Sequence, residues 1–75
     1  MSIIETHYGI KLEDGNIITK LIVTGRYYMK KKRFSSIYTA NEDGYRTAMG
    51  INLWNGSVWG LLSTGKRKLL KRVNN

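Results

Sequence analysis

Residues 6–23 read THYGIKLEDGNIITKLIV, and this stretch sets the strand pattern on which the rest of the chain builds. Asp14 and Gly15 separate two apolar alternations and both tolerate positive φ, so they predict a two-residue hairpin loop with Leu12 opposite Ile17. Side chains alternate across a strand, and paired residues share a face. We therefore expect a buried face made of Thr6, Tyr8, Ile10, Leu12, Ile17, Thr19, Leu21 and Val23.

Two further turn signals lie downstream of this hairpin. The sequence Asn41-Glu42-Asp43-Gly44 fits a type I turn followed by a left-handed glycine, which predicts a three-residue hairpin loop. Asn55-Gly56 is the preferred pair of a type I′ turn. The two hairpins share residues 45–54, so they predict a three-stranded antiparallel meander over about residues 33–62.

The predicted meander has two chemically different faces. Its aliphatic face is expected to carry Ile37, Tyr45, Met49, Ile51, Leu53, Val58 and Leu62. Its aromatic face is expected to carry Phe34, Tyr38, Trp54 and Trp59, with Ser36, Arg46, Asn52 and Leu61 among them. Aromatic side chains on a sheet either pack as core or, on an open face, stack with nucleic-acid bases. The first hairpin packed on this face would make it core.

The basic C-terminal segment, residues 63–75, allows two structures. Ser63 or Thr64 can cap a helix over residues 66–73, whose apolar residues fit a 3.6-residue period. Alternatively, Thr64-Gly65 is a further turn that leads into a last strand. We expect the helix.

The chain is expected to form a single small domain over residues 1–75. It has 75 residues, no proline and no Gly/Ser linker, and it lacks the cysteines of a disulfide or thiolate metal site. The expected fold is a β-rich α+β domain with an N-terminal β-hairpin, the three-stranded meander and a basic C-terminal helix. The alternative is an all-β small barrel with a C-terminal strand.

The apolar runs bear on the cellular compartment. Leu21-Ile22-Val23 is the longest, far below the ~20 residues that span a bilayer, and residues 2–5 lack the basic region of a signal peptide. We therefore expect a soluble cytoplasmic protein with no stable membrane association.

Candidate catalytic residues are few. The chain has one histidine, His7, and its carboxylates fall mainly in predicted turns. Residues 60–66 match the first part of a phosphate-binding loop, but Arg67 stands where a Ser or Thr should ligate magnesium. The expectation is a non-enzyme with no catalytic residue, metal or cofactor.

The charge distribution indicates the class of partner. The net charge is +8, and eleven of the thirteen basic residues follow Gly25, opposed there only by Glu42 and Asp43. Such clusters favour polyanions, above all nucleic acid, DNA or RNA. The residues expected to contact phosphates are Lys30, Lys31, Lys32, Arg33, Lys66, Arg67, Lys68, Lys71 and Arg72. The residues expected to contact bases are Arg46, Asn52, Trp54 and Trp59.

A second class of function fits the same composition. A small basic chain without a catalytic set suits a protein-binding module or an inhibitor that docks on an acidic surface of a partner protein. Trp and Arg are also the side chains that dominate the binding energy of protein interfaces.

Overall fold

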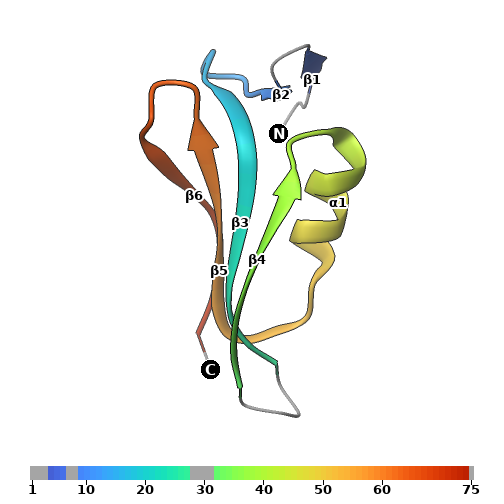
Figure 1. The fold of residues 1–75 in the computed structure, drawn as a ribbon, viewed down its shortest axis with the longest axis vertical. Helices are drawn as coiled ribbons and strands as arrows, with labels where there is room; N and C mark the ends of the chain where they lie inside the picture. The colour runs from blue at the N-terminus through green and yellow to red at the C-terminus, as the bar shows by residue number, and fades with distance from the viewer. Residues whose placement is uncertain (1–3, 7–8, 28–31, 75) are drawn as a thin grey trace.

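The computed structural model describes residues 4–6, 9–27 and 32–74. Within these residues the elements are β1 (Ile4–Thr6), β2 (Gly9–Lys11), β3 (Ile17–Tyr27), β4 (Arg33–Thr39), α1 (Glu42–Gly50), β5 (Leu53–Leu62) and β6 (Arg67–Val73). All strand pairs are antiparallel, and α1 lies on one side of the sheet (Figure 1). The expectation of a small β-rich α+β domain is confirmed.

Strand β3 is the centre of the sheet. It pairs with β5 along one side, from Ile18 to Tyr27, and with β4 along the other, from Lys20 to Arg26. The first residues of β3 pair with β2, which in turn pairs with β1, while β6 pairs with β5. The strand order is therefore β1-β2-β3-β5-β6, with β4 beside β3 on the same side as β2.

The first hairpin forms, but its loop differs from the prediction by one residue. Leu12 N donates to Asn16 O at 2.8 Å, Gly15 N donates to Leu12 O at 3.0 Å, and Gly15 has φ +89°. This is a three-residue loop with a left-handed glycine. It pairs Lys11 with Ile17, so the predicted pair of Leu12 with Ile17 is wrong. The Asp14 carboxylate accepts from Asn16 N at 3.0 Å and supports the longer loop.

A β-bulge at Thr19 adjusts which residues of β3 are buried. The pairing shifts between Ile18 and Lys20, and Thr19 Oγ1 donates to Leu61 O at 3.1 Å. An extra residue in one strand reverses its alternation. Ile18 is therefore buried in place of the expected Ile17 and Thr19. The rest of the expected face with described side chains is confirmed as buried: Ile10, Leu12, Leu21 and Val23. The side chains of Thr6 and Tyr8 lie outside the described residues.

The segment predicted as the second hairpin is a helix. Asn41 caps α1 by accepting a hydrogen bond from Gly44 N at 2.7 Å, and Glu42 and Asp43 lie in the first turn, where the helix dipole favours carboxylates. A type I turn has nearly helical dihedral angles, so both structures share these local signals. The predicted hairpin, the strand over residues 45–54 and the meander are therefore wrong.

The predicted third turn is also wrong, because Asn55-Gly56 lies inside β5. Gly56 is the cross-strand partner of Gly25, and a Cβ on Gly56 would lie 2.8 Å from the Gly25 Cα and 2.6 Å from Thr24 O. The Leu53 Cδ1 would be 3.2 Å from the same Cβ. The glycine is thus required for close approach of two strands and of Leu53 rather than for a reverse turn.

The C-terminal segment is a strand, so the predicted helix over residues 66–73 is wrong and the alternative of a last strand is right. Leu62 N donates to Lys66 O and Gly65 N to Leu62 O, which repeats the loop of the first hairpin. Val58 pairs with Lys71 and Trp59 with Leu69, so Leu70 is an extra residue of β6 and forms a β-bulge. The bulge places two apolar residues side by side in the sequence, and the spacing of the apolar residues of β6 therefore resembles a helical period. Among the described pairings β6 joins β5 alone, so the sheet is open rather than a closed barrel.

The core lies between α1 and the sheet. Its buried members are Ile10, Leu12, Ile18, Leu21, Val23, Ala40, Ala48, Leu53, Val58 and Leu62. Tyr45 and Met49 of α1 pack against them, so the helix presents one apolar side to the strands. Lys71 also connects β6 to the last turn of α1, since its Nζ donates to Met49 O at 2.7 Å.

The close pairing of Gly25 and Gly56 gives a first testable prediction. Gly56→Ala should lower the free energy of unfolding by about 1–3 kcal/mol, because the added methyl group meets backbone atoms that cannot move independently. Gly50→Ala is the matched control, since a Cβ there meets nothing within 4 Å. Urea denaturation checks both, and an equally stable Gly56→Ala variant would show that the strands separate easily.

A second prediction concerns the ion pair of Asp14 and Lys68, which connects the β2–β3 turn to β6. The hydrogen bond from Lys68, with that from Asn16 N, lowers the pKa of the Asp14 carboxyl from 3.8 to about 2. A lowered folded-state pKa stabilises the fold above pH 4, and this contribution is lost as the pH falls towards 2. Asp14→Asn should therefore lose less thermal stability than the parent chain between pH 4 and pH 2. Parallel melting curves for the two proteins would contradict this role.

Candidate functional site

The side of the sheet opposite α1 is open in the described part of the chain. The buried core residues of β3 and β5 point towards α1, and the residues between them point to the other side. Two large apolar side chains are exposed there: Ile37 at 67% and Leu69 at 39%. We call this side the open face, defined by the outward residues of β3, β4, β5 and β6.

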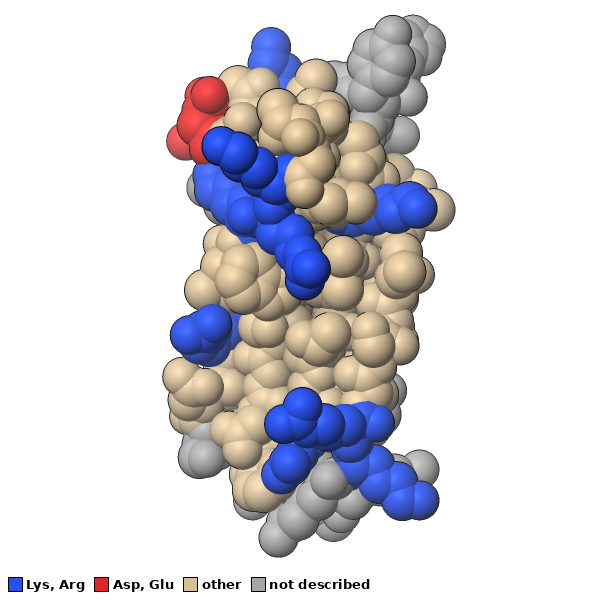
Figure 2. All heavy atoms as spheres, turned by 60° about the vertical axis from the view of Figure 1, so that its left-hand side comes forward, with Lys and Arg blue, Asp and Glu red and all other residues tan. Residues whose placement is uncertain are grey.

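The pairing registers order the open face into four rows across the strands. Listed from β4 through β3 and β5 to β6, the rows are Thr39, Lys20, Leu61 and Arg67; Ile37, Ile22, Trp59 and Leu69; Ser35, Thr24, Ser57 and Arg72; and Arg33, Arg26 and Asn55. We call the second of these the apolar row and the third, with Ser35, Thr24 and Ser57, the hydroxyl row. Both lie between the first and the fourth rows, which carry basic side chains. Figure 2 shows Lys and Arg in an upper and a lower group, with a band of mostly uncharged residues between them and a separate basic patch at the left edge of that band.

Trp59 is at the centre of the apolar row. It is half-buried between its cross-strand partners Ile22 and Leu69. Its Nε1 donates to Ser57 Oγ at 2.8 Å, and this oxygen lies 3.4 Å from Thr24 Oγ1. Trp59 and Ser57 are two residues apart on the same side of β5, so the bond holds the indole along the strand. The ring has one fixed orientation on the open face.

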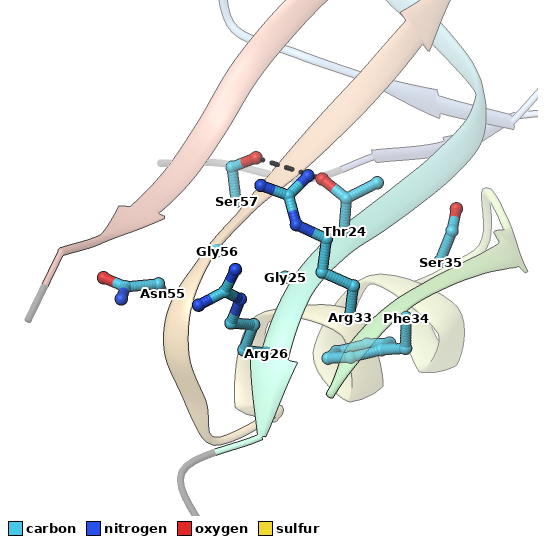
Figure 3. Close-up of a pocket in the computed structure, with 9 residues that line it drawn as sticks. All are labelled: Thr24, Gly25, Arg26, Arg33, Phe34, Ser35, Asn55, Gly56 and Ser57. Atoms are coloured by element: carbon cyan, nitrogen blue, oxygen red, sulfur yellow. Dashed lines mark hydrogen bonds between the residues drawn. The ribbon is translucent and has the colours of Figure 1, made fainter. Parts of the chain in front are cut away.

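Two arginines border a depression at one end of the open face. Arg26 and Arg33 are cross-strand partners, and they line a pocket of about 710 Å³ together with Thr24, Ser35 and Ser57. Figure 3 shows Arg33 extending from β4 across β3, and Arg26 extending from β3 on the side of Asn55. The pocket combines guanidinium groups, hydroxyl groups and the backbone of Gly25 and Gly56.

The arginines are not neutralised by a described carboxylate. The ion pairs between described residues are Arg46 with Glu42 and Lys68 with Asp14, both away from this pocket. Like charges directly opposite each other across two strands destabilise a sheet. An anion bound between Arg26 and Arg33 would remove this repulsion, so the pocket has the chemistry of an anion site.

The predicted aromatic face does not exist as one surface. Phe34 and Tyr38 pair with Gly25 and Leu21, and both pack against the core on the α1 side. Trp59 lies on the opposite side of the sheet. The faces were misassigned because β4 pairs with β3 rather than with residues 45–54, of which 45–50 belong to α1 and 53–54 to β5. For the same reason Ile37, expected on the aliphatic face, is exposed.

The predicted phosphate contacts fall into four groups. Arg33, Arg67 and Arg72 lie on the open face, while Lys32 and Lys66 are exposed in the connections beside it. Lys68 is paired with Asp14, and Lys71 donates to the end of α1. Lys30 and Lys31 lie outside the described residues.

The predicted base contacts are separated by the fold. Trp59 alone of the four is placed on the open face by the pairing register. Arg46 is on α1 and pairs with Glu42 at 2.9 Å, Asn52 is exposed between α1 and β5, and Trp54 is half-buried at the start of β5. The four side chains do not form one platform.

The sequence analysis did not identify Lys20, Arg26 or the hydroxyl side chains of Thr24, Ser35 and Ser57 as candidate site residues. A signal for three of these side chains was present, because the alternation that buries Leu21 and Val23 places Lys20, Thr24 and Arg26 on the opposite side of β3. The positions of Ser35 and Ser57 required the long-range pairing of β3 with β4 and β5.

Comparison of the chain with protein-family models, with curated proteins and with solved structures found no match. In residues 9–26 and 32–74, no three His, Cys, Asp or Glu side chains come together as a metal site would require. No helix in the described chain is long and apolar enough to cross a bilayer.

A third prediction compares the stability loss caused by truncating one leucine on each side of the sheet. Leu21→Ala should cost about 2–5 kcal/mol of unfolding free energy, because Leu21 is fully buried under α1. Leu69→Ala should cost under about 1 kcal/mol, since Leu69 is 39% exposed on the open face. Urea denaturation measures both. Equal losses would mean that the open face is covered in the folded protein.

Proposed function

We propose that this protein is a non-catalytic nucleic-acid-binding protein, for DNA or RNA, and that the open face is its binding surface. The observation that carries the proposal is the order of rows. An apolar row, with Ile37 and Leu69 exposed and the hydrogen-bonded indole of Trp59 between them, lies beside a hydroxyl row, and both lie between rows that carry basic side chains. Bases stack on aromatic rings, and phosphates pair with Arg and Lys.

The charges of the open face favour a polyanion over a neutral ligand. Its basic residues are Lys20, Arg26, Arg33, Arg67 and Arg72. Each neutralised phosphate releases counterions, which makes affinity depend steeply on salt concentration. Hydroxyl groups of Thr24, Ser35 and Ser57 add neutral donors of the kind that commonly contact phosphate oxygens.

A second candidate function rests on the apolar row. An exposed Ile37 and Leu69 beside Trp59, with arginines on either side, also fits the anchor of a protein interface. The partner would be a protein with an acidic surface, in accordance with the charge of the chain. Retention of a stoichiometric protein from nuclease-treated lysate, abolished by Trp59→Ala, would favour this function.

The fourth prediction tests nucleic-acid binding through salt and Trp59. If about five phosphates are neutralised, log affinity for a single strand should fall with log salt at a slope near −3.5. Trp59→Ala should weaken binding by about 1–3 kcal/mol, whereas Trp59→Phe keeps a stacking ring and most of the affinity. Fluorescence anisotropy with a labelled oligonucleotide measures both effects. A salt-independent affinity, or equal losses for the two variants at unchanged stability, would reject the proposal.

A further inference from the structure

We infer that the ligand of the open face is a single strand, one phosphodiester of which is held between Arg26 and Arg33 while a base stacks on Trp59. This inference rests on the proposed function and defines the class of nucleic acid and its position. It is carried by the pocket of Arg26 and Arg33, the hydroxyl chain beside it and the exposure of the apolar row.

The pocket has the donors that a phosphodiester requires. A guanidinium group presents paired N–H donors in a fixed fork, and this geometry matches two oxygens of one phosphate. Two such groups reach the pocket from neighbouring strands, and Ser35 adds a hydroxyl group from β4. One bound phosphodiester places a negative charge between two cations that otherwise repel each other across β3 and β4.

A chain of hydroxyl groups connects this pocket to the indole. Trp59 Nε1 can only donate, so Ser57 Oγ accepts its hydrogen at 2.8 Å. Between Ser57 Oγ and Thr24 Oγ1, 3.4 Å apart, either oxygen can be the donor: Ser57 donates to Thr24, or Thr24 donates to Ser57 and leaves the Ser57 hydrogen for a ligand. In the first arrangement Thr24 turns its own hydrogen towards the pocket that it lines. Each donor in such a chain polarises the next, so the indole and the phosphate site support each other.

The exposure of the apolar row distinguishes a single strand from a duplex. In a duplex the faces of the bases are stacked on each other, and only their edges and the phosphates are accessible. A duplex would therefore offer Ile37 and Leu69, 67% and 39% exposed, only phosphates and base edges, which cover less apolar surface than the face of a base does. A single strand offers unstacked bases to cover Trp59 and its neighbours.

The distance between the two sites fits a short segment of a single strand. Trp59 and Asn55, which is in the outermost row of the pocket, are four residues apart on β5, about 13 Å at ~3.3 Å per residue. Arg33 reaches back towards Thr24 and Ser57 (Figure 3), so about 13 Å is the upper limit of the separation. A strand stacked as in B-DNA rises about 3.4 Å per nucleotide, so the two sites are at most about four stacked nucleotides apart. The open face thus accommodates the smallest sites known for single-strand binding folds, about 4 nucleotides.

The fifth prediction tests the guanidinium fork with substitutions that preserve charge. Arg33→Lys should weaken binding of an oligothymidylate of about 16 nucleotides roughly tenfold or more, because lysine keeps the charge but loses the fork. Arg46→Lys is the matched control on α1, where Arg46 pairs with Glu42, and should change affinity less than about twofold. Anisotropy titrations of the full chain, with urea denaturation of each variant, provide the measurement. Equal affinities for Arg33→Lys and Arg46→Lys would overturn the phosphate site and leave the proposed function standing.

A duplex of the same length and an inorganic phosphate titration complete the experiment. The single strand should bind at least about tenfold more tightly than the duplex, and equal affinity would overturn the single-strand inference. Inorganic phosphate should shift the Nε–H resonances of Arg26 and Arg33 and the indole N–H resonance of Trp59. These shifts without any oligonucleotide binding would support the anion site and reject the proposed function. Their absence, with oligonucleotide binding intact, would count against the site.

Discussion

The structure depends on the pairing of β3 along both of its sides. Because β4 and β5 are fixed to the same central strand, the alternation of β3 determines the side on which every neighbouring side chain lies. The side chains of Leu21 and Val23 point to α1 and form part of the core, whereas those of Ile22 and Thr24 point away from α1. The bulge at Thr19 is a local adjustment that keeps Ile18 on the buried side.

The parts of the fold that the sequence predicts are those that depend on neighbouring residues alone. The turn at Asp14-Gly15 and the alternation that buries Leu21 and Val23 are such features. Both are present, but the loop is one residue longer than predicted and the bulge at Thr19 breaks the expected alternation over residues 17–19. Judged from neighbouring residues alone, Asn41 and the acidic residues that follow it fit a turn and a helix N-terminus equally well. The helix is selected by contacts of Tyr45, Ala48 and Met49 with strands distant in sequence.

Long-range packing also explains the other two errors. Asn55-Gly56 is a strong local turn signal, yet Gly56 is needed where the chain approaches Gly25 and Leu53. The bulge at Leu70 gives β6 an apolar spacing that resembles a helix. Of the candidate site, the basic clusters and Trp59 could be named from sequence, but not which cations are free for a ligand. Lys68 and Lys71 proved to be held by Asp14 and by α1.

The position of β6 at the end of the strand order has a consequence for association between copies of the chain. β6 pairs with β5 on one side, and it carries Arg67, Lys68, Lys71 and Arg72 in a run of seven residues. A second copy that added its own β6 in the same sheet would bring this row of cations beside another one. Natural sheets use charged outer strands to prevent such edge-to-edge aggregation. The basic residues of β6 thereby oppose edge-to-edge association of sheets into fibres, independently of any ligand on the open face.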